Sequence, residues 1–427
     1  MLGPVRHTRR ASASTPIRVL AVDHTAGLAG GEVALSRLLG AIDATRFHTS
    51  VVLLEDGPLV ERLRAGGIDV DVQPTSKELT TVGRAEAVAS PLAAASSAMR
   101  SLATVPRLAR AIRAAQPDLV VANSLKSAVL VGIAAPLAGR RWVWHLHDRI
   151  AEDYLPGVMV RGLRLLARHG PRVVVVNSEA TRATLGRLRG GKTVVAYPGL
   201  EVAAFDPAQR ETANALFGLL GRIAPTKGQT EFLRAAALVA ARLDEAQFAV
   251  IGEAMFNDAG FAERIRALPH ELGIDERVEF TGWAADPVAA IARLTALVHA
   301  SPVPEPFGQV LVEAMLAGVP VIGTNAGGVP EIIDPERVGE EISPGLIRAP
   351  LGLLARPGDP DALAAAMMWS VENPAEVDSM RLRARESAAA RFDIRLSARL
   401  VESGWALAVG RPEGIDPSVR EGQLTDG

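Results

Sequence analysis

Cysteine is absent from this 427-residue sequence, so disulfide bonds, thiolate metal ligands and cysteine catalysis are excluded. That absence is typical of proteins in a reducing cytoplasm. Long apolar runs are missing too, because no segment offers the roughly 18 uncharged apolar residues that a membrane-spanning helix needs. The first 16 residues hold basic side chains with no apolar run behind them, unlike a secretory signal peptide. We expect residues 1–16 to be a disordered leader and residues 411–427 to be a disordered tail.

The length favours two domains, and a composition of 48% apolar and 22% charged residues is that of a soluble globular protein. The net charge of −2 hides an asymmetry. Residues 1–196 carry 26 Lys and Arg against 15 Asp and Glu, which leaves 20 and 33 for residues 197–427. This indicates two domains with different partners, the basic half suiting phosphates, an anionic acceptor or an anionic membrane. No nucleic-acid motif accompanies the basic residues.

Short β-rich apolar runs alternate with helix-patterned segments along the chain, which is typical of parallel sheets covered on both faces. The rhythm breaks at YPGLEVAAFDP and then restarts. We expect a first domain over 17–196, a linker over 197–214, a second domain over 215–392, and a helix within 393–410 that crosses back to the first domain. The predicted fold class is α/β, with two doubly wound Rossmann-like domains facing a central cleft. The expected strands are 17–22, 49–54, 69–73, 119–122, 142–145, 173–176, 215–220, 246–251, 278–281, 297–300 and 319–324.

The segment EPFGQVLVEAMLAGVPVIGTNAGGVPE follows one of these strands and opens a helix near Gly308. Loops at the carboxyl ends of parallel strands bind ligands, and the free amides of Gly308, Gln309 and Val310 would point at an anion. Glu305 and Glu313 flank this helix start, and carboxylates suit the vicinal hydroxyls of a sugar. A surface helix with acids at its N-terminus explains the same residues, so that alternative stays open.

This stretch, with two glutamates separated by seven residues and a later Gly-Gly-x-x-Glu, resembles the retaining GT-B glycosyltransferases of family GT4. GRIAPTKGQTEFLRAA at 221–236 is similar to that family's G-R-L-x-x-x-K-G segment. The resemblance implies that Arg222 and Lys227 clamp a donor diphosphate, and that the Phe307–Gly308 step and Glu313 belong to the donor site. Preorganised cations stabilise the charge that develops on such a leaving group without a metal. Two ordinary surface cations are the alternative.

Two sites in the first half extend the resemblance. LAGGE at 28–32 is similar to the family's Gly-Gly-x-Glu loop, which implies that Gly30 and Gly31 lie over the donor phosphates or the acceptor; a plain tight turn is the alternative. Where relatives carry two histidines, this sequence has Val121 and Asn123, and the Asn123 amide can still bond a sugar hydroxyl.

The histidines of VWHLHD lie a short way further along the chain. His145 and His147 share one face of a strand, and His147 lies at the strand end near the cleft. We predict that His147 contacts the donor sugar or the acceptor, with Asp148 orienting it. A buried structural histidine explains the motif equally well.

An Asp-x-Asp motif and two basic helical stretches are further patterns in the sequence. Asp69 and Asp71 form an Asp-x-Asp inside an alternating strand, which we do not interpret as a metal site. The basic helical stretches 100–113 and 161–172 combine arginine with apolar residues, which suits either a solvated surface or an anionic membrane.

The resemblance implies a metal-independent transfer of a sugar, with retention, from a nucleoside diphosphate donor to an acceptor hydroxyl, with UDP or GDP favoured and no cofactor. The reaction would serve the synthesis of glycans, envelope polysaccharides or glycosylated metabolites. We expect a cytoplasmic protein, with the inner membrane face as a further location. The alternatives are another GT-B enzyme, such as a sugar-nucleotide epimerase, and a non-catalytic partner subunit with this fold.

Overall fold

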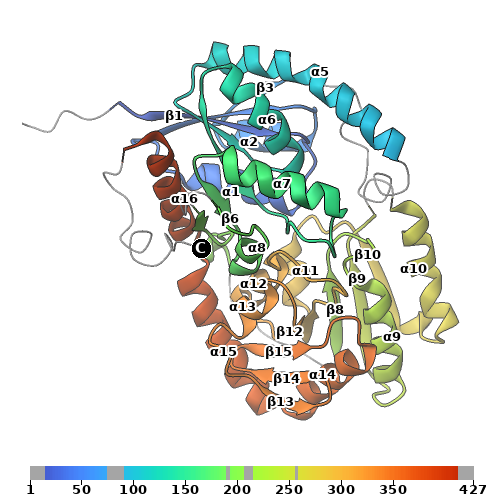
Figure 1. Cartoon of the computed structure of the whole chain (residues 1–427). Helices are drawn as coiled ribbons and strands as arrows, with labels where there is room; N and C mark the ends of the chain where they lie inside the picture. The colour runs from blue at the N-terminus through green and yellow to red at the C-terminus, as the bar shows by residue number, and fades with distance from the viewer. Residues whose placement is uncertain (1–14, 75–90, 189–192, 206–214, 255–257, 412–427) are drawn as a thin grey trace, which may run out of the picture.

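The computed structural model describes residues 15–74, 91–188, 193–205, 215–254 and 258–411, and for 91–102 it describes the backbone alone. The expected leader and tail therefore lie almost wholly outside the described residues, as does half of the expected linker. The described residues form two separate sheets, each with its own helices, and the two sheets lie one above the other in the cartoon (Figure 1).

The first sheet has seven parallel strands in the order β3-β2-β1-β4-β5-β6-β7. Its centre is β4, whose four residues are all buried because helices cover both faces of the sheet. The order steps outward from β1 in both directions, which is the doubly wound arrangement predicted from the sequence. Its strands are β1 (Ile17–Asp23), β2 (Phe47–Leu53), β3 (Asp69–Val72), β4 (Leu119–Ala122), β5 (Arg141–Leu146), β6 (Val174–Val176) and β7 (Thr193–Val195).

Helices cover both faces of this sheet. On one face pack α1 (Gly30–Ala41), α2 (Pro58–Ala65) and α16 (Ile394–Val409), with Trp405 of α16 fully buried among them. On the other face pack α5 (Pro91–Ala115), α6 (Leu125–Leu137) and α7 (Gly157–His169). A short helix, α8 (Glu179–Ala183), follows β6. The last helix of the chain thus lies against the first sheet, beside α1 (Figure 1).

The second sheet has eight strands in the order β10-β9-β8-β11-β12-β15-β14-β13. The first six run parallel, whereas β14 is antiparallel to β15 and β13 to β14. Sequence patterns predicted the parallel strands β8 to β12 but missed β13, β14 and β15, and in the first sheet they missed β7. Its strands are β8 (Leu216–Leu220), β9 (Gln247–Ile251), β10 (Val278–Gly282), β11 (Ala296–Val298), β12 (Val321–Thr324), β13 (Glu340–Ser343), β14 (Leu346–Ala349) and β15 (Gly352–Ala355).

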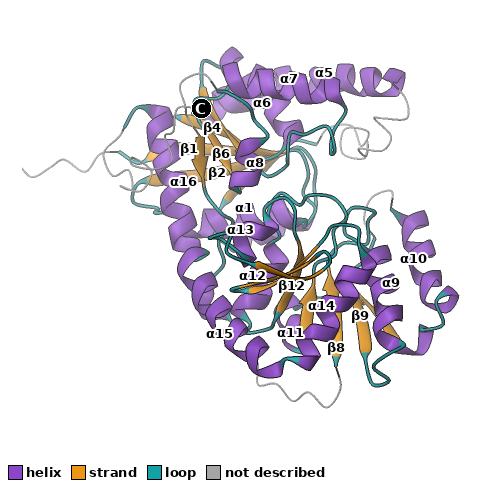
Figure 2. Ribbon diagram, turned by 60° about the horizontal axis from the view of Figure 1, so that its bottom comes forward, coloured by secondary structure: helices purple, strands orange, loops and turns teal. Residues whose placement is uncertain are grey.

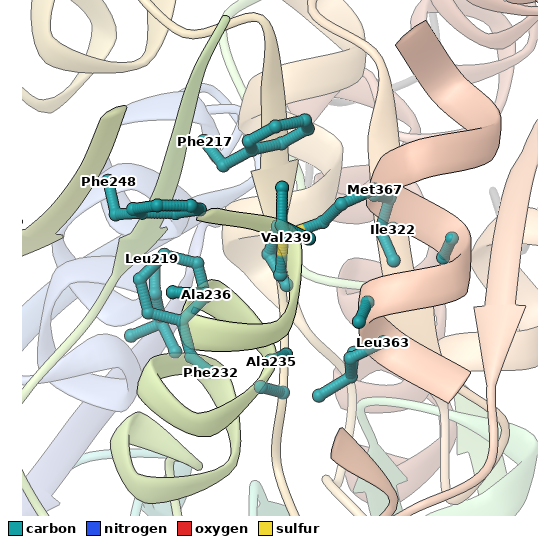
Figure 3. Close-up of a cluster of buried hydrophobic side chains, with 14 of the residues drawn as sticks. Phe217, Leu219, Phe232, Ala235, Ala236, Val239, Phe248, Ile322, Leu363 and Met367 are labelled. Atoms are coloured by element: carbon teal, nitrogen blue, oxygen red, sulfur yellow. The ribbon is translucent and has the colours of Figure 1, made fainter. Parts of the chain in front are cut away.

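Two apolar layers sandwich the second sheet. On one face α9 (Gln229–Ala240), α10 (Ala259–Glu271) and α14 (Pro360–Glu372) bury a cluster that contains Phe217, Phe232 and Phe248 (Figure 3). On the other face lie α11 (Pro287–Ala292), α12 (Gln309–Leu316), α13 (Val329–Ile333) and α15 (Pro374–Arg391). The second view shows these helices on both sides of the sheet (Figure 2). None of the described helices combines the length and apolarity that crossing a bilayer requires.

Side-chain contacts join the two halves at the carboxyl ends of their strands. Ser178, the N-cap of α8, donates from its Oγ to the carbonyl of Pro306 at 2.6 Å. Glu331 of α13 accepts from the backbone amides of Glu179 at 2.9 Å and Ala180 at 2.6 Å. Tyr197 donates its hydroxyl to the same Glu331 carboxylate at 2.9 Å. The two sets of strand ends therefore face one another, which is where α/β proteins bind ligands.

Candidate functional site

The loop after β8 carries both predicted cations, and it is held against the end of β11. Gly228 has φ of +79°, and a Cβ there would lie 1.9 Å from the carbonyl oxygen of Ala300. Ser301 donates from its Oγ to the Thr226 carbonyl at 2.6 Å. A glycine is therefore required at position 228, because any side chain would push this loop away from β11.

Lys227 forms an ion pair with Glu305, so residues from the ends of two adjacent strands meet. The Glu305 side chain is only 12% exposed, whereas that of Lys227 is 35% exposed. His299, directly after β11, places Nε2 at 4.0 Å from Oε2 of Glu305. Burial lowers the pKa of His299, and the Lys227 charge adds to that effect while Glu305 opposes it. His299 is therefore neutral at neutral pH, and it was not anticipated from the sequence.

Arg222 lies on the same loop but is directed to a different carboxylate. Its Nε is 3.7 Å from Oδ2 of Asp258, just before α10. Its backbone carbonyl accepts from the Gln229 side chain at 2.9 Å. The structure thus brings Lys227 and Glu305 into direct contact, whereas the Arg222 guanidinium is turned toward α10.

The start of α12 follows the Glu305 loop. Gly308 is its N-cap with φ of +109°, a conformation that favours glycine. One turn on, Glu313 is buried, and its Oε1 accepts from Gln309 at 3.0 Å and from Arg37 of α1 at 3.3 Å. The first free amides of α12 and Glu313 therefore lie within the first two turns of this helix, directly after the Glu305 loop.

The side chains of Phe307 and Val310 pack into the apolar layer beneath the loop. The Phe307 ring is 4% exposed and stacks on Tyr197, with Phe392 edge-on at 5.6 Å. Val310 is half-buried against the same cluster. These side chains support the loop, and what they offer a ligand is their backbone.

The Gly-Gly pair further on lets a second loop press against Glu305. The amide of Gly328 donates to the Glu305 carbonyl at 2.9 Å. A Cβ on Gly327 would lie 2.0 Å from that same carbonyl oxygen, so the close approach depends on glycine.

In the first half, polar side chains from three neighbouring strand ends form a chain of hydrogen bonds. Asn123, after β4, donates from Nδ2 to Oδ2 of Asp23 at 2.6 Å. His147, after β5, lies with Nε2 at 3.0 Å from Oδ1 of Asn123. That oxygen can only accept, so His147 Nε2 carries the proton. Asn123 is 2% exposed with both amide groups engaged, so it orients His147, and a substrate hydroxyl would have to displace one of these bonds.

The two histidines of β5 have different surroundings. His145 is buried, accepts from the indole of Trp405 at 3.1 Å and stacks on that ring. Burial lowers its pKa to about 3, so it is a structural residue. Burial also lowers the pKa of His147, although Asp148 and Asp23 oppose that shift. The Asp148 carboxylate accepts from Tyr154 at 2.8 Å.

The Gly30–Gly31 step opens α1 beside His147. A Cβ on Gly31 would lie 3.8 Å from the His147 ring, whereas one on Gly30 would meet nothing within 4 Å. Glu32, which the sequence did not single out, is buried at this helix start. Burial raises its pKa to about 8, with Asp23 and Asp148 adding repulsion.

Carboxylates and histidines such as these can also ligate metal ions. Within the part of the chain that the structure describes, no group of three or more His, Asp or Glu is arranged to hold a metal ion. Asp69 and Asp71 both lie on the exposed face of β3, and Asp71 accepts from Gln73 at 2.8 Å.

This arrangement, two Rossmann-like sheets with functional loops at opposed strand ends, defines a GT-B protein. Residues 30–204 match the model of Glycosyltransferase Family 4, and residues 204–391 match that of Glycosyl transferases group 1. The chain belongs to the GT4-type glycosyltransferases of the GT-B superfamily.

Related proteins agree with this assignment. A GDP-mannose-dependent alpha-(1-6)-phosphatidylinositol monomannoside mannosyltransferase of Mycobacterium tuberculosis is 30% identical over 190 residues, 40% of this chain and 48% of the relative. A D-inositol 3-phosphate glycosyltransferase of a Mycobacterium species is 32% identical over 170 residues, 37% and 38% of the two chains. This chain therefore spans about half the length, or less, of the curated relatives it matches.

A solved structure covers more of the chain. Anabaena Alr3699/HepE, crystallised with UDP and glucose, aligns with a TM-score of 0.76 at 25% identity. The alignment covers 91% of this chain and 99% of that one. A sucrose-phosphate synthase from Thermosynechococcus elongatus, 18% identical over 91% and 98% of the two chains, shares the fold with a TM-score of 0.71.

Proposed function

We propose that this protein transfers a sugar from a nucleoside diphosphate donor to an acceptor hydroxyl, with retention of the anomeric configuration. The observation that carries the proposal is the meeting of Lys227 and Glu305 beside the N-terminus of α12. A cation and free helix amides suit a diphosphate, and a carboxylate suits sugar hydroxyls. Membership of the GT4-type enzymes supports the same reading.

Each group has a chemical role in the proposed reaction. The bond between the anomeric carbon and the diphosphate breaks, and the acceptor oxygen bonds to that carbon on the same face. The acceptor proton passes to a phosphate oxygen of the leaving diphosphate. Lys227 and the amides at Gly308–Val310 stabilise the charge that develops on the diphosphate, and Arg222 joins them by leaving Asp258.

The opposing half would hold the acceptor and the outer face of the donor sugar. Neutral His147, oriented by Asn123, offers a hydrogen bond at the strand ends of the first sheet. Gly30 and Gly31 leave room beside it for a ligand backbone or phosphate. The excess of basic residues in this half suits an anionic acceptor.

We propose that the donor nucleotide carries uracil or guanine as its base. The Anabaena protein is bound to UDP in its crystal structure, and the mycobacterial relative is described as GDP-mannose-dependent. A thermal-shift panel with UDP, GDP, ADP and dTDP tests this directly, because a ligand at a hundred times its Kd stabilises by about 2.7 kcal/mol. Stabilisation by ADP or dTDP alone would exclude both proposed bases.

We also propose that the face formed by α6 and α7 contacts an anionic membrane. Val129, Ile133 and Leu137 form an exposed stripe along α6, and Val158 and Leu165 form one along α7. Neither helix contains an acidic residue, and Arg161 and Arg168 continue the α7 stripe. Apolar side chains among arginines on a helix surface suit binding at an anionic lipid interface. Figure 2 places α6 and α7 beside each other, at the end of the molecule opposite the second sheet.

Vesicle sedimentation tests the membrane contact. Wild type should sediment with vesicles that contain anionic phosphatidylglycerol. With vesicles of neutral phosphatidylcholine it should stay in the supernatant. The double variant V158D/L165D should lose this binding, whereas L382D, at an exposed leucine of α15, should keep it. Equal sedimentation of all three proteins would contradict the proposal.

A further inference from the structure

His299 holds a buried hydrogen-bond donor that faces the candidate sugar site. The residue is 7% exposed, and its Nε2 has no hydrogen-bond partner among the described residues. Its Nδ1 lies 3.4 Å from the hydroxyl of Thr324, at the end of β12. Buried polar atoms nearly always have a partner, so an orphaned ring nitrogen at this place calls for a functional explanation.

The ring proton belongs on Nε2. That atom faces Oε2 of Glu305 at 4.0 Å, and a carboxylate oxygen accepts but does not donate. The Thr324 hydroxyl then donates to Nδ1, which fixes the tautomer. His299 is therefore a neutral donor held slightly too far from Glu305 for a hydrogen bond.

Donor binding would change the partners of the Glu305 carboxylate. In the structure Lys227 contacts the Glu305 carboxylate, and a diphosphate bound beside α12 would draw the lysine toward its own charge. Glu305 is largely buried, and a buried carboxylate that loses its cation needs replacement hydrogen bonds to stay ionised and oriented. His299 Nε2 is within a small side-chain movement of supplying one.

We propose that His299 is a positioning residue for Glu305: its Nε2–H bonds the carboxylate once the donor diphosphate engages Lys227, which keeps Glu305 aimed at the hydroxyls of the transferred sugar. This inference rests on the proposed function. It implies that His299 matters for a nucleotide sugar and not for the free nucleoside diphosphate, because only the sugar uses Glu305.

A pair of substitutions of similar size separates this role from packing. His299→Gln keeps an N–H donor near the position of Nε2, whereas His299→Met has a similar length and no donor. An exposed histidine, His270, whose side chain is 89% exposed, provides the control His270→Met. For each variant we would measure the Kd for UDP and GDP by titration calorimetry. The rate at which nucleotide sugar is converted to nucleoside diphosphate gives kcat, and the melting temperature reports on folding.

We expect H299M to bind the nucleoside diphosphate within about twofold of wild type and to lose about 10- to 100-fold in kcat, the range for an unsatisfied group next to a charge. H299Q should retain kcat within about threefold, and H270M should match wild type. Equal kcat for H299M and H299Q, whether both are normal or both are lost, overturns the inference. Wild type that binds no nucleoside diphosphate or nucleotide sugar overturns the proposed function itself, so the two failures are distinguishable.

Discussion

Arg37 of α1 and Glu313 of α12 form an ion pair that joins the two halves of the molecule. Both terminal nitrogens of Arg37 lie 3.3 Å from Oε1 of Glu313. Gln309 donates to the same oxygen at 3.0 Å, so three N–H donors converge on Oε1. Arg37 therefore orients the carboxylate that we place in the proposed donor site, and it does so from the opposite half.

Replacing Arg37 should weaken donor binding more than it slows the chemistry. In R37A we expect KM for the nucleotide sugar to rise about five- to thirtyfold, since one charge-assisted contact at a partly exposed pair is worth about 1–2 kcal/mol. The control is R64A, at an exposed arginine of α2. Steady-state kinetics decide the matter: an unchanged KM in R37A, or tighter donor binding, would contradict an orienting role.

The approach of the Lys227 loop to β11 should depend on Gly228. Gly228→Ala combines a left-handed backbone with a contact to the Ala300 carbonyl that must be relieved by moving the loop. Gly273→Ala is the matched control, because Gly273 has φ of +69° with open space around its missing Cβ. We expect G273A to lose about 1 kcal/mol of stability and keep nucleoside diphosphate binding, and G228A to lose that binding. Normal binding by G228A in calorimetry would show that the loop position does not matter.

The raised pKa of Glu32 predicts a pH dependence of stability. Because burial raises this pKa to about 8 in the folded protein, folding retains a proton that the unfolded chain releases near pH 4.5. The free energy of unfolding contributed by Glu32 is thus fully present below about pH 4.5 and is lost as the pH rises toward 8.

Glu32→Gln should remove that loss. Relative to wild type, E32Q should gain about 4 kcal/mol in unfolding free energy between pH 5 and pH 8.5, measured by urea denaturation at several pH values. The control E55Q, at a carboxylate that accepts from Thr25, makes the same Glu-to-Gln change and leaves Glu32 in place. Parallel curves for E32Q and wild type would mean that Glu32 is not protonated in the folded protein.

Glu331 should hold the two halves together. Its carboxylate accepts from two amides of α8 and from Tyr197, so E331A leaves three partly buried donors without this acceptor. We expect E331A to lower the unfolding free energy by about 2–4 kcal/mol and Y197F by about 1 kcal/mol. E336A, at an exposed glutamate after α13, should be neutral within about 0.5 kcal/mol. Melting temperatures that fall equally for E331A and E336A would contradict this role.

Local patterns were enough to predict much of the fold. Most of the parallel strands and the start of α12 follow from apolar runs, glycines and the charge at each loop, and the structure confirms them, whereas β7 was missed. The hairpin β13–β15 was missed because its strands are short and irregular in pattern. Domain boundaries and the roles of the site residues remain predictions.

What the sequence could not supply were contacts between distant residues. Arg37 and Glu313 are 276 positions apart, and nothing local to either marks the pair. Asn123 was expected to face a sugar, yet the neighbouring strand ends engage both of its amide groups. Phe307 was predicted to contact the ligand because it belongs to the motif expected at the donor site. Its ring instead completes an aromatic cluster with Tyr197 and Phe392. His299 could have been noticed as a polar residue directly after a buried strand.

The central claim is that Lys227 and Glu305 together hold a nucleotide sugar at the start of α12. The most direct measurement is nucleotide-sugar turnover, with UDP and GDP sugars, by wild type, K227A and E305A, with K126A on α6 as the control lysine. We expect K227A and E305A each to lose about 100- to 1,000-fold in kcat, the range for removal of one group that stabilises transition-state charge, with K126A unchanged. Wild-type rates in both variants would contradict the account.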